Sequence, residues 1–243
     1  MKTCAACIVL IVICLPNSET RANGLIQKLP QDGSWVRYHT RINIEKPQKT
    51  EFTGTLTIRS VGRKTVNNEP CRWIEFDMTM NIENRTERTI SKILVPEKLF
   101  KSEKSVSPKV IRGWIKRNDA DPKEETDTEK LSSDEFAAFL PDPSRKVKTV
   151  KVKKTVDYQK GQLTVESAIT GSVKLPVPEN AKIKIESTFD FTMWSHEKVP
   201  FGTAEAKWEF SSKLEDQLLS KGTVTLTLED FGTGAKSALP DHN

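Results

Sequence analysis

Residues 181–210 contain two runs in which apolar and polar side chains alternate, and no other stretch constrains the fold as strongly. Successive side chains of a strand point to opposite faces, so each run predicts a strand with one buried face. A short connection carrying Pro200 and Gly202 predicts that the two strands pair antiparallel. The residues expected to point inward are Ala181, Ile183, Ile185, Ser187, Phe189, Phe191 and Met193, followed by Ala204, Ala206, Trp208 and Phe210.

The same alternation recurs elsewhere in the chain and predicts a β-rich domain. Short polar turns separate the first four runs, which is typical of an antiparallel meander. About nine strands are expected in all. Besides the pair above, they cover residues 36–44, 52–58, 74–82, 86–95, 146–156, 162–173 and 224–228.

After the fourth expected strand the apolar spacing becomes helical. Ser107 and Pro108 suit an N-cap followed by the first helical residue, and residues 110–115 carry apolar side chains at helical spacing. Residues 96–104 have a helical pattern too, and capping boxes predict short helices over 132–140 and 212–222. The expected fold class is therefore α+β, mostly β. It is a curved antiparallel sheet, an open or half barrel, with two or three short helices inserted after the fourth strand.

The N-terminus has the features of a secretory signal peptide. Lys2 precedes an uncharged run over residues 5–15, and Thr20-Arg21-Ala22 provides a small-residue exit. This run is shorter than the ~20 apolar residues of a membrane-spanning helix. We expect cleavage after Ala22 and export to the periplasm or the extracellular space. Residues 23–243 would then form a single β-rich domain, with an exposed acidic loop at 118–131 and a flexible tail at 232–243.

Cysteine usage excludes an intramolecular disulfide in the mature chain. Three of the four cysteines lie in the expected signal peptide, which leaves Cys71 alone. A lone thiol beside a strand usually acts as a small buried hydrophobe. An intermolecular disulfide is the functional alternative.

The loop Trp194-Ser195, continuing to Val199-Pro200-Phe201-Gly202, together with the expected plan, resembles uncharacterised secreted bacterial proteins. Their architecture is similar to the lipoprotein-carrier (LolA/LolB-type) half-barrels, which hold acyl chains between sheet and helices. The resemblance implies an apolar cavity and identifies no ligand residue by itself. The inward pattern supplies the cavity candidates, which are Phe76, Met78, Met80, Phe189, Phe191, Met193, Trp114 and Trp208.

Catalytic and metal-binding patterns are weak. His196 stands next to Glu197 and follows Asp190, and a histidine–carboxylate pair could act as a general base. No nucleophilic serine motif accompanies it, so an enzyme is not expected. The acidic loop lacks the glycine and terminal glutamate spacing of an EF-hand. Neither a metal nor a cofactor is expected.

A basic surface is expected on the fifth strand, at Lys146, Lys148, Lys151 and Lys153. Lysines on an edge strand block edge-to-edge pairing, and the alternative is binding of acidic lipid headgroups or polysaccharide. No aromatic residues are interleaved to support nucleic-acid binding, so a nucleic-acid partner is not expected.

Three hypotheses for function follow. The first is an exported, non-enzymatic protein that binds an apolar or amphiphilic ligand, lipid or lipoprotein-like, between sheet and helices. The second is a structural or protein-interaction module of the cell envelope, with a packed core and no ligand. The third is a hydrolase using His196.

Overall fold

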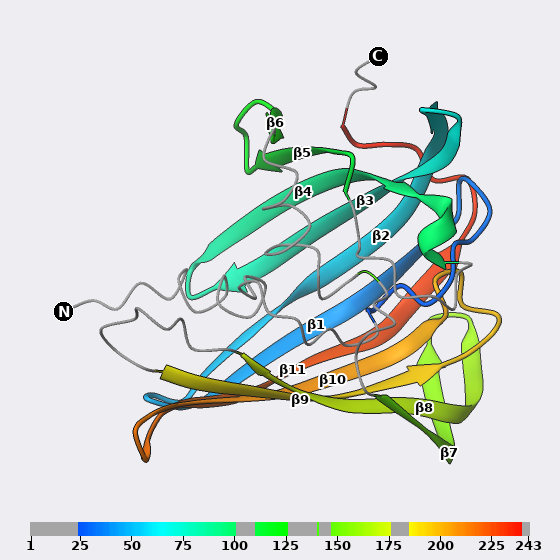
Figure 1. Cartoon of the computed structure of the whole chain (residues 1–243). Helices are drawn as coiled ribbons and strands as arrows, with labels where there is room; N and C mark the ends of the chain where they lie inside the picture. Colours follow the sequence, from blue (N-terminus) through cyan, green and yellow to red (C-terminus); the bar gives the residue numbers. More distant parts are fainter. Residues whose placement is uncertain (1–23, 101–109, 126–139, 141–146, 176–184, 240–243) are drawn as a thin grey trace.

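The computed structural model describes residues 24–100, 110–125, 140, 147–175 and 185–239, which form one antiparallel sheet of 11 strands (Figure 1). The strand order is β6-β5-β4-β3-β2-β1-β11-β10-β9-β8-β7. The strands are β1 (Trp35–Lys46), β2 (Thr50–Val66), β3 (Glu69–Ile82), β4 (Arg85–Pro96), β5 (Arg112–Arg117), β6 (Lys123–Glu125), β7 (Val147–Tyr158), β8 (Gly161–Leu175), β9 (Ile185–Ser195), β10 (Thr203–Leu214) and β11 (Gln217–Gly232).

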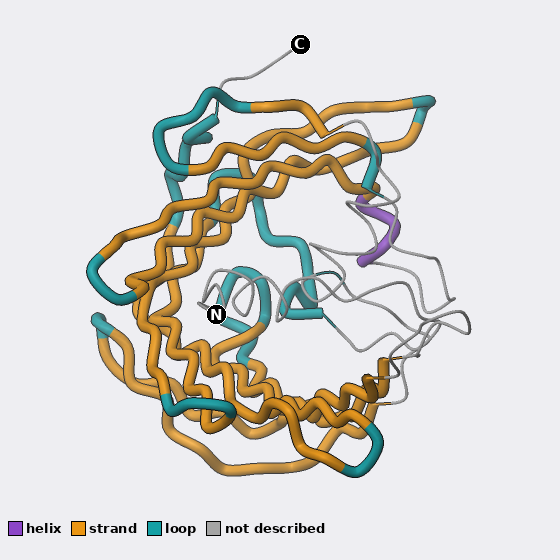
Figure 2. Tube along the Cα trace, turned by 90° about the vertical axis from the view of Figure 1, so that its left-hand side faces the viewer, coloured by secondary structure: helices purple, strands orange, loops and turns teal. Residues whose placement is uncertain are grey.

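Two sequence-local meanders make up the sheet, and they join where β1 pairs with β11. The sheet is strongly curved, and its strands wrap around loops on the inner side (Figure 2). The turn between β7 and β8 contacts β11. There the backbone amide of Gln159 donates a hydrogen bond to the Glu229 carbonyl over 2.9 Å. We call the inner side of the sheet the concave face and the outer side the convex face.

The hairpin expected within residues 181–210 is confirmed in its described part. β9 and β10 pair antiparallel, with Met193 opposite Ala206 and Phe189 opposite Phe210. The rings of Phe189 and Phe210 stack with their centroids 6.3 Å apart. One inward assignment is wrong, because Ile185 begins β9 with 44% of its surface exposed. Residues 181–184 lie outside the described part of the chain.

Alternating residues of the strands bury two apolar clusters on the concave face, and this burial is the main stabilising term of such a sheet. The larger cluster includes Tyr38, Ile58 and Phe76 from β1–β3 and Phe191 and Met193 from β9. The smaller cluster lies toward one end of the same face. Its buried members are Ile42, Ile44, Phe52, Met80, Ile82, Phe189, Phe210 and Val224.

The expectation of inserted helices is wrong for residues 110–117, which lead into and form β5. A helix would place Val110, Ile111, Trp114 and Ile115 on one face. In the structure, Val110 and Ile115 pack in the larger concave cluster, whereas Ile111 and Trp114 pack against a cluster on the convex face. Hydrogen bonding to the edge of β4 decides the conformation, and a short apolar run does not reveal this partner.

The other helix expectations also change. Residues 212–222 form a tight hairpin between β10 and β11 in place of a helix, with Glu215 at a φ of 54° in the turn. Of 96–104, residues Glu97–Phe100 form the 3-10 turn η1, which is the only helical turn in the described residues. The helix expected over 132–140 falls outside them except for buried Leu140, and part of the acidic loop 118–131 forms the short strand β6. In the described part of the chain, the fold is thus an open β-sheet of 11 strands and not the expected α+β arrangement.

Candidate functional site

The concave face brings side chains from both meanders toward one apolar surface. Met78 on β3 and Trp208 on β10 pack against both concave clusters, and each remains partly exposed. Met78 lies opposite Leu56 and Thr89 in the sheet, and Trp208 lies opposite Phe191 and Val224. These two residues are therefore the part of the concave face that keeps accessible apolar surface between two buried cores.

Most of the expected cavity residues share the concave face. Phe76, Met80, Phe189, Phe191 and Met193 are buried in the two clusters there. Trp114 does not join them. It packs against the convex cluster of Cys71, Trp73 and Leu94, with the Arg112 guanidinium 5.4 Å from its ring centroid.

A short segment after the expected signal peptide lies inside the sheet and is held there by the β9–β10 loop. Leu25 and Ile26 are fully buried in the larger cluster, beside Val199 and Phe201 of that loop. The backbone amide of Gln27 donates a hydrogen bond to the Phe201 carbonyl over 3.0 Å. Apolar contact and backbone pairing together fix this segment on the concave side, which the sequence pattern did not indicate.

Side chains complete the attachment of this segment. The Gln27 side chain accepts a hydrogen bond from Ser195 Oγ (2.8 Å) and donates to Thr203 Oγ1 (3.1 Å). The Thr203 hydroxyl donates to the Leu25 carbonyl (2.7 Å), and buried Tyr38 donates to the Thr203 carbonyl (2.7 Å). Burial raises the pKa of Tyr38, so its hydroxyl stays protonated and remains a donor.

Gly202 shows why this loop ends in glycine. Its φ is +92°, a conformation that favours glycine, and a Cβ there would lie 3.1 Å from Gln27 Cβ. A larger residue would strain the turn and press on the buried segment. The loop that carried the sequence resemblance thus has a structural role in holding residues 25–28.

His196 makes hydrogen bonds within the same β9–β10 loop. Its Nδ1 accepts a hydrogen bond from the Lys198 amide (3.1 Å), and its backbone amide donates to the Gly202 carbonyl (2.8 Å). Asp190 lies further back on β9, in register with Ser172 and Glu209, so it is not the partner of this imidazole. These contacts give His196 a role in loop geometry.

The basic surface lies on β7, an edge strand of the described sheet. Lys148, Lys151 and Lys153 are exposed, whereas Lys146 falls outside the described residues. Lys148 also borders an open groove of about 540 Å³ over β7–β10, which includes Asp190, Lys207 and Glu209. The Lys207 ammonium lies 2.6 Å from Glu209 Oε1 and lowers the pKa of that carboxyl. The groove carries side chains of both charges, and Phe191 of the larger concave cluster also borders it.

The sequence also gave no sign of a charged cluster on the convex face. Glu75 and Asp77 of β3 are buried there, and Arg59 donates to both of them over 3.0 Å. Arg88 donates to both oxygens of Asp77, each over 2.9 Å. Burial alone would raise the pKa of Asp77, but the hydrogen bonds from Arg88 and Arg59 outweigh it and lower that pKa.

Cys71 is buried on the convex face. Burial raises the pKa of its thiol, and the nearby Glu69 charge adds to the shift. Both effects disfavour the thiolate that disulfide exchange requires. Within the described residues, no group of three or more His, Cys, Asp or Glu side chains is placed to hold a metal ion. No helix in that part of the chain is long and apolar enough to cross a membrane.

No family model matches the chain, and no curated protein matches it. A solved structure from Bacteroides fragilis, described as a “putative exported protein with YmcC-like fold”, aligns over 87% of this chain and 100% of its own. The two are 8% identical, with a TM-score of 0.30.

Proposed function

We propose that the chain is an exported, non-enzymatic binding protein that holds an apolar or amphiphilic ligand, such as an acyl chain, on the concave face of its sheet. The observation that carries the proposal is the pair Met78 and Trp208. They come from opposite meanders, border both buried clusters and keep accessible apolar surface. Export is part of the proposal and rests on the basic start, the apolar run and the small-residue exit at Ala22.

The chemistry of this surface favours an acyl chain over a polar ligand. A methionine thioether and an indole ring adapt to flexible apolar partners, and each methylene removed from water contributes about 0.8 kcal/mol. The buried partners of these two side chains, Phe191 and Leu56 among them, would form the floor of the site. The lipoprotein carriers that the sequence resembles use an apolar site for the same class of ligand.

The first test is native mass spectrometry of the mature protein, purified gently from its own host. A discrete added mass that organic extraction removes would support the proposal and identify the ligand class. A clean mass would favour the alternative, an envelope interaction module whose apolar face is only a packed core.

The second test places the ligand. A dibrominated long-chain fatty acid quenches tryptophan fluorescence at short range, so binding at the concave face should quench Trp208. The Trp208→Phe variant should lose much of the saturable quenching. The matched Trp35→Phe variant should keep it, because Arg37 and Lys160 lie over the Trp35 ring on the other face. Equal quenching in both variants would show that the fatty acid binds elsewhere.

A further inference from the structure

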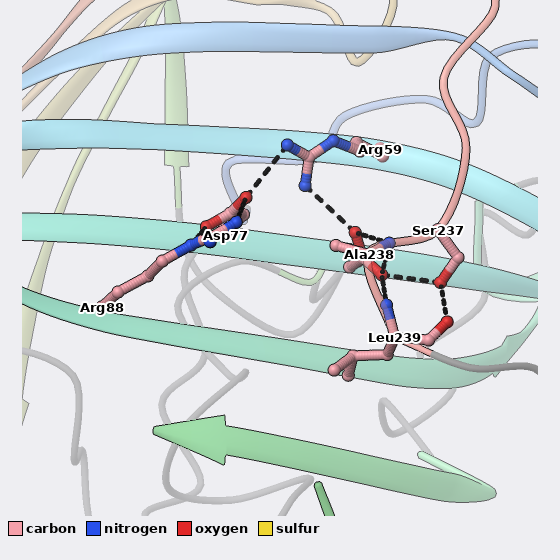
Figure 3. Close-up of polar contacts among 7 residues, drawn as sticks. Arg59, Asp77, Arg88, Ser237, Ala238 and Leu239 are labelled. Carbon is pink, nitrogen blue, oxygen red and sulfur yellow. Dashed lines mark hydrogen bonds and ion pairs between the residues drawn. The ribbon is translucent and has the colours of Figure 1, made fainter. Parts of the chain in front are cut away.

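The described part of the C-terminal segment crosses the convex face and contacts a buried carboxylate. After β11, the Thr233 carbonyl accepts a hydrogen bond from Trp35 Nε1 (3.3 Å), and the Ala235 amide donates to the Gly33 carbonyl (2.8 Å). The chain then reaches Glu75, to which residues 237–239 donate hydrogen bonds. Figure 3 shows Ser237, Ala238 and Leu239 beside Arg59. From the sequence we predicted a flexible tail at residues 232–243. In the structure, residues 233, 235 and 237–239 of this tail make specific contacts with the sheet and with the loop before β1.

Glu75 is bound by the segment through several donors. The amide of Ala238 lies 3.1 Å from Oε1 and 3.0 Å from Oε2, and the amide of Leu239 lies 3.2 Å from Oε2. The Ser237 hydroxyl donates to Oε2 over 2.7 Å. A carboxylate that accepts consecutive backbone amides recognises a bent peptide backbone, because successive amides point the same way only in a turn or nest, and Ala238 and Leu239 form a bend here.

The surroundings of Glu75 make this a built site. Its side chain is fully buried, and Arg59 Nη1 donates to Oε1 over 3.0 Å. In the sheet, Glu75 lies between Arg59 on β2 and Lys92 on β4, and Lys92 is only 2% exposed. The Arg59 guanidinium offsets the charge of this buried carboxylate, and the segment shields it from water. Leu239 adds an apolar anchor, since only 3% of its surface is exposed.

We propose that Glu75, with Arg59, forms a peptide-recognition site for the C-terminal segment, and that a second copy of this chain can supply the segment in place of the chain's own. Residues 237–239 fit Glu75 in the structure, and a second copy of the chain carries the same segment. The junction with β11 contains Gly232 and Gly234, and Gly234 has a φ of +82° with no atom within 4 Å of a Cβ position. Such a junction can redirect the segment, which is how chains exchange terminal elements.

Occupancy by the chain's own segment should normally dominate. A tethered segment acts at an effective concentration in the millimolar range, so a free one competes poorly. The test therefore needs a full-length chain whose own segment cannot bind. Ala238→Pro removes the amide donated to both Glu75 oxygens and leaves Glu75 untouched.

The first measurement uses a fluorescently labelled synthetic peptide of residues 232–243. Fluorescence anisotropy should show the peptide binding to the Ala238→Pro chain at least roughly tenfold more tightly than to the unmodified chain. A peptide carrying proline at 238 should not bind, and adding Glu75→Gln to the Ala238→Pro chain should abolish binding. If the Ala238→Pro chain folds but gains no affinity for the peptide, there is no recognition site.

Ser237→Ala provides the measurement if the proline variant does not fold. It removes one contact to Glu75 and should give a smaller gain in peptide affinity than Ala238→Pro would. No gain in a folded Ser237→Ala chain would contradict the proposal equally.

The second measurement tests the second copy as donor. The Glu75→Gln chain has an intact C-terminal segment and a weakened recognition site. The Ala238→Pro chain has an intact recognition site and a C-terminal segment that cannot bind. Analytical ultracentrifugation at high protein concentration should show each variant alone as a monomer and their mixture as containing a heterodimer. A mixture that stays monomeric, although the peptide binds, would overturn the second copy as the occupant.

Discussion

Gly54 on β2 is a position where a single methyl group should disrupt the sheet. It lies opposite Thr40 on β1 and Met80 on β3. A Cβ at Gly54 would lie 2.1 Å from the Thr79 carbonyl oxygen, 2.6 Å from Met80 Sδ and 3.0 Å from Met80 Cα. Two of these obstacles are backbone atoms of β3, so a side-chain rotation cannot relieve the clash.

The expected cost of Gly54→Ala follows from this geometry. Overpacking costs about 1–3 kcal/mol, and displacing the β3 backbone adds about 1 kcal/mol if a ladder hydrogen bond is lost. We expect a loss of about 3 kcal/mol in the free energy of unfolding. For a chain of this length that corresponds to a fall in Tm of roughly 6–12 °C.

Gly171→Ala is the matched comparison. A Cβ there would also clash, at 2.5 Å, but with the tip of the Phe191 ring. A ring can tilt, so the cost should be smaller, at about 1 kcal/mol. Urea unfolding followed by circular dichroism measures both variants. The reasoning is refuted if Gly54→Ala is as stable as the unmodified protein, or if Gly171→Ala is the more damaging change.

Three other predictions follow from contacts described above. Ionised Asp77 should stabilise the fold above its ordinary pKa of 3.8, and this contribution should disappear as the pH falls through its lowered folded-state pKa. The stability difference between the unmodified protein and Asp77→Asn should therefore shrink between about pH 5 and pH 2, and a constant difference would contradict this. Cys71 should react with a thiol reagent only after denaturation, and rapid labelling of the native protein would show that it is accessible. Gln27→Ala should cost about 1–2 kcal/mol in urea unfolding by removing two side-chain hydrogen bonds, whereas the exposed control Gln48→Ala should be neutral.

The strand content was predictable because burial on one face leaves a period of two in the sequence. The pattern of β1 and the β9–β10 pair is confirmed on this basis. The pattern was less informative for β3, where residues 71–77 are buried on both faces. Burial on the convex face depends on partners that are distant in sequence, such as the C-terminal segment that covers Glu75. The local alternation of apolar and polar residues does not reveal such partners.

The helix predictions failed for a related reason. Ser212 and Glu215 have the spacing of a capping box, but the same residues close a hairpin in which Ser212 pairs with Ser220. In the candidate site, the inward orientation of the aromatic residues on β3, β9 and β10 was predictable from the alternation of apolar and polar residues. The attachment of residues 25–28 did not, since their hydrogen bonds to Ser195 and Thr203 join positions more than 160 residues apart.

The central position of β1 and β11 also sets the order in which this chain can fold. Each meander pairs neighbours in sequence, so both can form early and locally. The seam between them joins Trp35 to Thr233, 198 positions later, and it cannot close until the last strand has been made. Until then β1 presents an unpaired edge in the middle of the future sheet, which is the state most exposed to wrong partners. Synthesis of the final strand is therefore the step that commits the chain to its native form.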